Sequence, residues 1–85
     1  MIIFTKHARE KFKILERHGV KLREEQVIKA VESPEHIDHS RLPLLIAQRK
    51  LDAKHVLRVV YRQDRTTRTV ITFYPGRTSQ YEKNV

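Results

Sequence analysis

The spacing of hydrophobic and polar positions changes near the middle of this 85-residue chain. Between residues 5 and 33 the apolar residues recur every three or four positions, which is typical of helices that bury one face. Between residues 36 and 75 they gather in short runs rich in branched and aromatic residues, which is typical of strands. The pattern predicts one α+β domain covering residues 1–85, in which two helices lead into a sheet.

The helical part divides into two helices. The first is expected over Lys6–His18, because Thr5 is a favourable N-cap and Gly19 suits the position after a helix end. The second is expected from about residue 23 to residue 32, and Pro34 ends it, since the residue before a proline avoids the helical region. The residues expected to face the core are Ala8, Phe12, Leu15, Val27, Ile28 and Val31.

Several runs in the chain favour strands. The three longest follow one another with short connections, which indicates an antiparallel meander. We therefore expect two N-terminal helices packed on one face of a three- to four-stranded antiparallel sheet. The three main strands are expected at Leu44–Leu51, His55–Arg62 and Arg68–Pro75. Ile2–Phe4 and Glu35–His39 are candidates for a short first strand and a short edge strand.

Alternation along the last two strands predicts which residues share a face. The set that we expect beneath the helices is Leu57, Val59, Tyr61, Ile71 and Phe73. The opposite set is Val56, Arg58, Val60, Arg62, Val70, Thr72 and Tyr74. This second set mixes apolar and hydrogen-bonding side chains, so it is either a binding face or an ordinary solvent-facing sheet surface.

The charge of the chain is strongly positive. It has 18 Lys and Arg against 10 Asp and Glu, a formal net charge of +8. Arginine in particular matches phosphate oxygens in pairs, so the composition favours RNA or an acidic protein as partner. The absence of cysteine fits a reducing, cytoplasmic location. The longest apolar run, residues 42–47, is too short to cross a membrane.

Some residues suit RNA cleavage by transfer to the 2′-hydroxyl, which needs a proton acceptor, charge stabilisation and a proton donor. His7 falls in the first turn of the first helix, where unsatisfied N–H groups favour phosphate. Arg58 lies in mid-strand, where a charge needs water or a ligand. Arg77 and Tyr81 follow the last strand and would close over a phosphate. The alternatives are a surface histidine and a frayed basic tail.

Other kinds of site are disfavoured. Only two glycines are present, so phosphate-binding glycine-rich motifs are excluded and no cofactor is expected. His36 and His39 would point to opposite faces of a strand, so no metal site is expected. His18 is interpreted as a cation at a helix end, and His55 as the first residue of a strand.

Nearly the whole chain resembles a known group of small domains. The segments that carry the likeness are FTKHAREKF, ERHGV, VIKAVESPE, HVLRVVY and VITFYP. Together they resemble the domains of unknown function related to BrnT, within the wider RelE-like toxin group.

The resemblance implies a metal-independent ribonuclease that acts on mRNA, free or on the ribosome, and is neutralised by a small antitoxin protein. By position, Arg58, Arg77 and Tyr81 match the habit of this group, and His7 matches the histidine of its opening motif. The further residues expected to contact RNA are Arg9, Arg49, Lys50, Thr72 and Tyr74.

Three other functions compete with the leading hypothesis of a toxin-type endoribonuclease. The second hypothesis is a non-catalytic RNA- or ribosome-binding module. A DNA-binding regulator is disfavoured because Glu24 and Glu25 at the start of the second helix would repel phosphates. A protein-interaction domain with an acidic partner also remains. The nuclease hypothesis requires Arg58 and Arg77 to cluster with a histidine or phenol on one side of the sheet.

Overall fold

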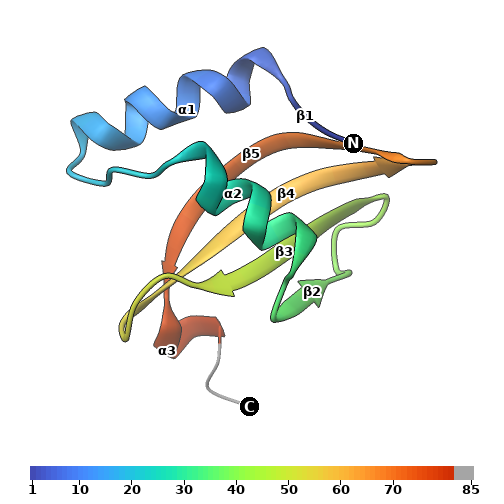
Figure 1. Cartoon of the computed structure of the whole chain (residues 1–85). Coiled ribbons are helices and arrows are strands. Elements are labelled where there is room, and N and C mark those ends of the chain that lie inside the picture. The colour runs from blue at the N-terminus through green and yellow to red at the C-terminus, as the bar shows by residue number, and fades with distance from the viewer. Residues whose placement is uncertain (82–85) are drawn as a thin grey trace.

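The computed structural model describes residues 1–81, except for the side chain of Tyr81. The α+β class is confirmed, and the predicted helices and strands end within two residues of their expected bounds. A short third helix, α3, follows the last strand and was not predicted. In chain order (Figure 1) the elements are β1 (Ile2–Phe4), α1 (Lys6–Arg17), α2 (Glu24–Glu32), β2 (His36–Asp38), β3 (Leu44–Lys50), β4 (His55–Asp64), β5 (Thr67–Arg77) and α3 (Thr78–Tyr81).

The sheet has five strands in the order β1-β5-β4-β3-β2, and it is mixed. Strands β2 to β5 form the expected antiparallel meander, but β1 pairs with β5 in parallel. The prediction of a three- to four-stranded, purely antiparallel sheet was therefore wrong. The partners of β1 lie more than 60 residues away: the N-terminal amine of Met1 donates to the Thr66 carbonyl at 2.8 Å. Local patterns cannot indicate such a pairing.

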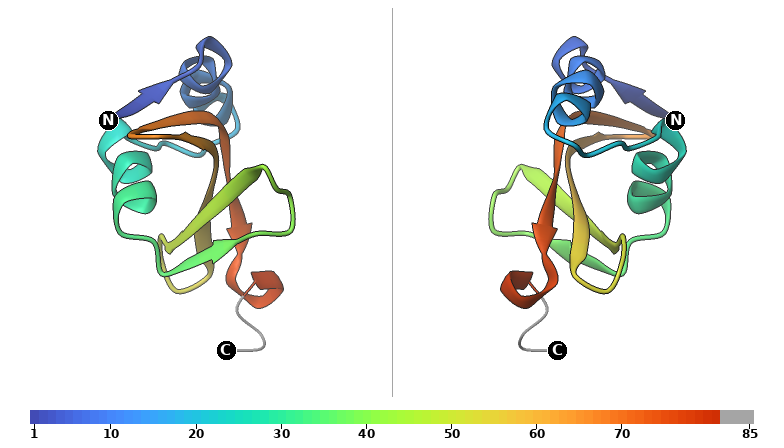
Figure 2. Two further views of the ribbon diagram at one scale, coloured as in Figure 1. Left: turned by 90° about the vertical axis from the view of Figure 1, so that its right-hand side faces the viewer. Right: turned by 90° about the vertical axis from the view of Figure 1, so that its left-hand side faces the viewer.

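Helices α1 and α2 pack on one face of the twisted sheet (Figures 1 and 2). The ring centre of Phe12 lies 4.6 Å from that of Phe73, which joins α1 to β5. In α2, Ala30 is fully buried and Ile28 only partly, so the predicted apolar face is displaced by part of a turn. The buried cluster comprises Ala8, Val27, Ala30, Val31, Ala47, Leu57, Val59, Tyr61, Val70 and Phe73.

A β-bulge reverses the alternation in part of β5. Val60 pairs with Thr72, whereas its neighbour Tyr61 pairs with Val70, so Ile71 has no partner in the register. An extra residue in one strand turns the residues on one side of it to the other face. Val70 is consequently fully buried beneath the helices and Ile71 is not. The prediction had assigned these two residues to the opposite faces and was wrong.

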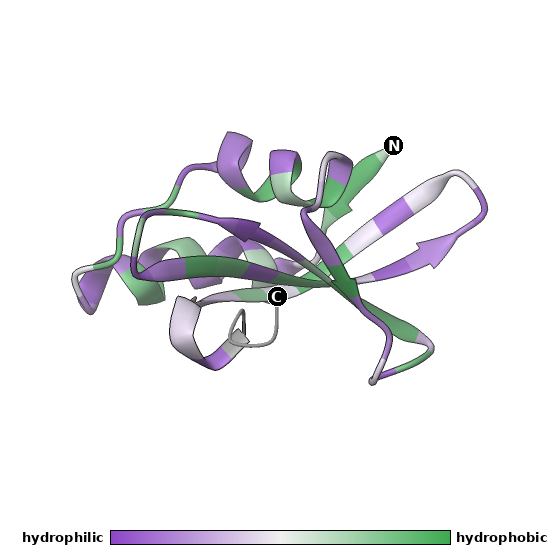
Figure 3. Cartoon of the chain, turned by 90° about the horizontal axis from the view of Figure 1, so that it is seen from below, coloured by the Kyte–Doolittle hydropathy of each residue, from purple (hydrophilic) through white to green (hydrophobic). Residues whose placement is uncertain are grey.

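The outer surface of α2 is polar. Seen from below, α2 lies at the top of the view with hydrophilic residues along its outer side, and the strands alternate between hydrophilic and hydrophobic (Figure 3). In the described part of the chain, no helix has the length and apolar character needed to cross a membrane.

Candidate functional site

The two arginines expected to share a phosphate lie on opposite faces of the sheet. Arg77 is directly opposite His55 in the β4–β5 register, and both follow the alternation of Leu57, which faces the helices. Arg58 pairs with Tyr74 on the other face. The expected cluster of Arg58 and Arg77 on one side of the sheet is therefore not formed, and the nuclease hypothesis fails in the form that the sequence predicted.

Arg58 belongs to a buried polar network. It is 5% exposed, and its guanidinium donates to Tyr74 Oη (3.2 Å), Gln48 Oε1 (2.6 Å) and Asp38 Oδ2 (2.9 Å). Hydrogen bonds from Ser40, and then the Arg58 guanidinium, hold the pKa of Asp38 well below its usual range. The network joins residues of β2, β3, β4 and β5, so the hydrogen bonds that Arg58 donates link four strands of the sheet.

Two of the predicted RNA contacts lie on the same face of the sheet as Arg58. Tyr74 is directly opposite Arg58, and Thr72 is opposite Val60. A hollow of about 390 Å³ opens above Arg58 and Tyr74. Asp38 lines this hollow too, so a carboxylate already stands beside the cation that was expected to bind RNA.

His7 is far from Arg77. The start of α1 is held at the beginning of β5, since Thr5 N donates to the Val70 carbonyl at 3.0 Å. Arg77 lies seven residues further along β5, about 20 Å away at the rise of a strand. His7 is exposed. The nearby Arg9 lies over the Phe4 ring, 5.2 Å from its centre.

Arg49 and Lys50 lie at the end of β3, where they line a small cavity of about 110 Å³ together with Lys29. Arg49 Nη1 donates to the Ser33 carbonyl at 2.7 Å, so this side chain has a defined direction. Tyr81 ends α3, and its side chain lies outside the described residues, so its predicted role remains a prediction.

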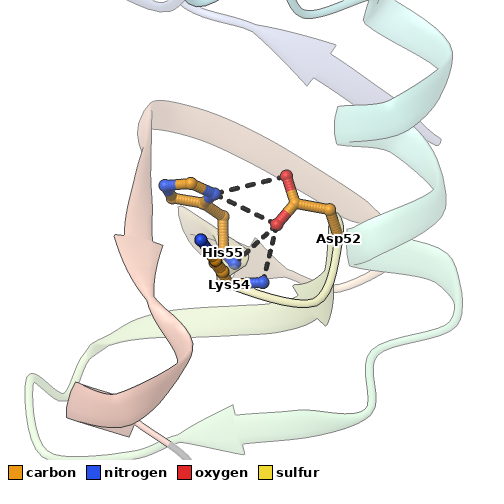
Figure 4. Close-up of polar contacts among 3 residues, drawn as sticks. All are labelled: Asp52, Lys54 and His55. Atoms are coloured by element: carbon orange, nitrogen blue, oxygen red, sulfur yellow. Dashed lines mark hydrogen bonds and ion pairs between the residues drawn. The ribbon is translucent and has the colours of Figure 1, made fainter.

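The side chains of Asp52 and His55 contact each other, and neither residue was predicted to belong to the site. They lie where the β3–β4 turn meets β4 (Figure 4). Asp52 Oδ1 accepts from the backbone N–H groups of Lys54 and His55, both at 2.8 Å, and from His55 Nδ1 at 3.0 Å. The Lys54 N–H foremost, and then the ring and N–H of His55, lower the pKa of Asp52.

This contact determines which nitrogen of His55 is available. Both carboxylate oxygens of Asp52 are acceptors and lie 3.0 and 3.2 Å from Nδ1, so Nδ1 carries the proton. In the neutral ring Nε2 is then an acceptor, and it points away from Asp52 in Figure 4. The His55 side chain is 47% exposed, so a ligand can reach it. A histidine oriented in this way by a carboxylate is suited to accept a proton.

His55 lines an open cavity of about 640 Å³ that also holds Lys54 and Arg77. Thr78 N donates to the Lys54 carbonyl at 2.8 Å, which ties the β3–β4 turn to the start of α3. Thr78 lines the same cavity, but its hydroxyl is buried and has no hydrogen-bond partner among the described residues. Two cations and an oriented imidazole suit an anionic ligand such as a phosphodiester.

The spacing of Asp52 and His55 along the sequence indicates part of this contact. An aspartate at the start of a turn accepts from the N–H groups two and three positions ahead, and this brings its carboxylate to the side chain of the third residue. Asp52 and His55 have that spacing. The sequence shows the turn and the strand start, but whether the Asp52 carboxylate meets the ring depends on the His55 rotamer.

Within residues 1–81, no three His, Asp or Glu side chains come together as a metal ion would require. No family model, no curated protein and no solved structure matches this chain.

Proposed function

We propose that this chain is an endoribonuclease that cleaves RNA without a metal ion, at the end of the sheet where β4 begins and β5 ends. One observation carries the proposal: His55, whose ring contacts the Asp52 carboxylate, lines a cavity that also holds Lys54 and Arg77. The net charge of +8 and the likeness of the sequence to the BrnT-related group support it.

The residues of the cavity match the requirements of the reaction. His55 Nε2 takes the proton of a ribose 2′-hydroxyl, and the 2′-oxygen attacks the adjacent phosphorus. Arg77 and Lys54 offset the negative charge that grows on the phosphoryl oxygens. The bond from phosphorus to the 5′-oxygen breaks, and the imidazolium returns its proton to that oxygen through solvent. The products are a 2′,3′-cyclic phosphate and a 5′-hydroxyl.

The substrate and partner that we propose follow the sequence resemblance. The target is mRNA, free or on the ribosome, and a small antitoxin protein is the inhibitor. A chain with an excess of cations attracts both RNA and an acidic protein inhibitor. The proposal places the protein where mRNA is translated, in the cytoplasm.

The test is cleavage of single-stranded RNA in EDTA by purified protein. His55→Gln removes the proton acceptor and is expected to lower the rate at least about 100-fold. Asp52→Asn retains an acceptor oxygen for the turn but removes the charge that orients the ring, so its rate also falls. His39→Gln is the matched control, because His39 is exposed and lies between β2 and β3. Products ending in a cyclic phosphate would identify the reaction.

His7→Gln separates this site from the one predicted from sequence. If His7→Gln abolishes cleavage and His55→Gln does not, the proposed site is wrong. If wild-type protein leaves RNA intact, free and on translating ribosomes, but binds it, the chain is a non-catalytic RNA-binding module instead.

A further inference from the structure

We propose that three adjoining cavities form one continuous track for single-stranded RNA, with the His55 site at one end. The inference rests on the proposed function, and it names the part of the substrate beyond the bond that is cut. The track runs from Arg77 on β5, past His55 on β4 and Leu51 after β3, to Lys29 on α2.

Shared lining residues show that the cavities are adjacent. The cavity beside Arg77 and a second one of about 370 Å³ share His55. The second and the small cavity beside Arg49 share Gln26 and Leu51. Leu51 N donates to the His55 carbonyl at 2.9 Å, which holds the middle of the path together. From β5 to β3 the path crosses two interstrand spacings, about 10 Å, before it reaches α2.

The lining of the track is strongly cationic. Among the described residues, Asp52 is the one acidic residue that lines these three cavities, and it already accepts hydrogen bonds from His55 and the turn. The cations that line them are Lys21, Lys29, Arg49, Lys50, Lys54 and Arg77. By contrast, the hollow above Arg58 contains Asp38, and the hollow near Met1 contains Glu32. Six of the 18 Lys and Arg residues therefore line this one path at the end of the sheet.

The path suits a single strand. It bends around the end of the sheet over cavities of different sizes, so a stiff duplex cannot follow it. The cleavage step also needs the 2′-oxygen, the phosphorus and the 5′-oxygen in line, a geometry that a flexible strand can reach. His55 is the only aromatic side chain lining these three cavities, all within the described residues. Binding therefore depends on the backbone, with little preference for the base.

The test measures affinity and cleavage separately. A 2′-O-methyl RNA of twelve nucleotides has no nucleophile, so its binding, followed by fluorescence anisotropy at several salt concentrations, is independent of catalysis. The double variant Lys29→Gln/Arg49→Gln is expected to bind it about tenfold more weakly, and to reduce the slope of log K against log salt by about 1.4 if each side chain neutralises one phosphate. Cleavage of a dinucleotide, which reaches only the His55 site, is expected to stay unchanged.

The control variant is Lys13→Gln/Arg62→Gln. It removes the same two charges from exposed positions, and Arg62 lies seven residues along β4 from His55, about 20 Å away. Equal loss of affinity in both double variants would show that only net charge matters and would overturn the track. Tighter binding of the same sequence as a duplex would also overturn it. If His55→Gln cleaves RNA normally while the track variant still binds weakly, the proposed function fails and the track stands.

Discussion

The network around Arg58 allows a sharp test of how this sheet is stabilised. The perturbation is Asp38→Asn, which keeps the shape of the side chain and an acceptor oxygen but removes the negative charge. The Arg58 side chain is 6% exposed and that of Asp38 is 26% exposed. In the variant the guanidinium therefore stays in a nearly dry site and loses the negative charge of Asp38 beside it.

The structure sets the size of the effect. Removing one partner of a fully buried ion pair costs about 3–5 kcal/mol. Asp38 is partly exposed, and the asparagine oxygen still accepts from Arg58, so we expect a loss of about 2 kcal/mol in the free energy of unfolding. A domain of this size has a total of the order of 5 kcal/mol. A loss of about 2 kcal/mol lowers Tm by roughly 10 °C.

The assay is urea unfolding followed by circular dichroism for Asp38→Asn, Arg58→Met and the double variant. Because the two side chains are in contact, the double variant is expected to lose less than the sum of the single losses by at least about 1 kcal/mol. Asp64→Asn, an exposed site on β4, is the control, with an expected change within about 0.5 kcal/mol. If Asp38→Asn behaves like that control, with an unchanged m-value, the reasoning about the network is refuted.

Three further predictions concern stability. Folding depresses the pKa of Asp38 below its unfolded value of about 3.9, so the stability that the ionised carboxylate contributes is present above pH 4 and is lost as the pH falls below that. The urea midpoint of wild type should therefore fall more between pH 5 and pH 3 than that of Asp38→Asn, and parallel curves would contradict this. Thr5→Ala removes the acceptor for Ala8 N (3.1 Å) and should cost about 1 kcal/mol in urea unfolding, whereas a loss below 0.3 kcal/mol would show that the cap contributes little. Gly19 has a φ of +83° and open space around its Cα, so Gly19→Ala should cost about 1 kcal/mol from backbone strain alone; a neutral result would show that the turn after α1 relaxes.

Much of the fold is predictable because it is local. The N-cap at Thr5, the glycine after α1 and the proline after α2 each act on adjacent backbone, so the helix ends follow from residue type. The strands of the meander follow from branched and aromatic runs with short connections. The pairing of β1 with β5 is different, because it joins residues at opposite ends of the chain. No pattern near either strand specifies it.

The candidate site was also predictable from the sequence only in part. Residue types indicated a cationic surface suited to phosphate, and Arg77 lies in the cavity that we propose as the active site. Arg58 was expected to face a ligand, but Asp38, Gln48 and Tyr74 take its donors across neighbouring strands. His55 was interpreted only as the start of a strand.

By itself, the sequence determined the class of fold, the helix ends, the strand order of the meander and the sign of the charge. Each of these depends on neighbouring residues or on composition. The tertiary structure decided that Val70 and not Ile71 is buried beneath the helices, because a single bulge turns side chains to the other side of a sheet. It also decided that Asp52 orients His55 and that Arg58 is held within the protein, since both outcomes depend on side-chain contacts a few ångströms long.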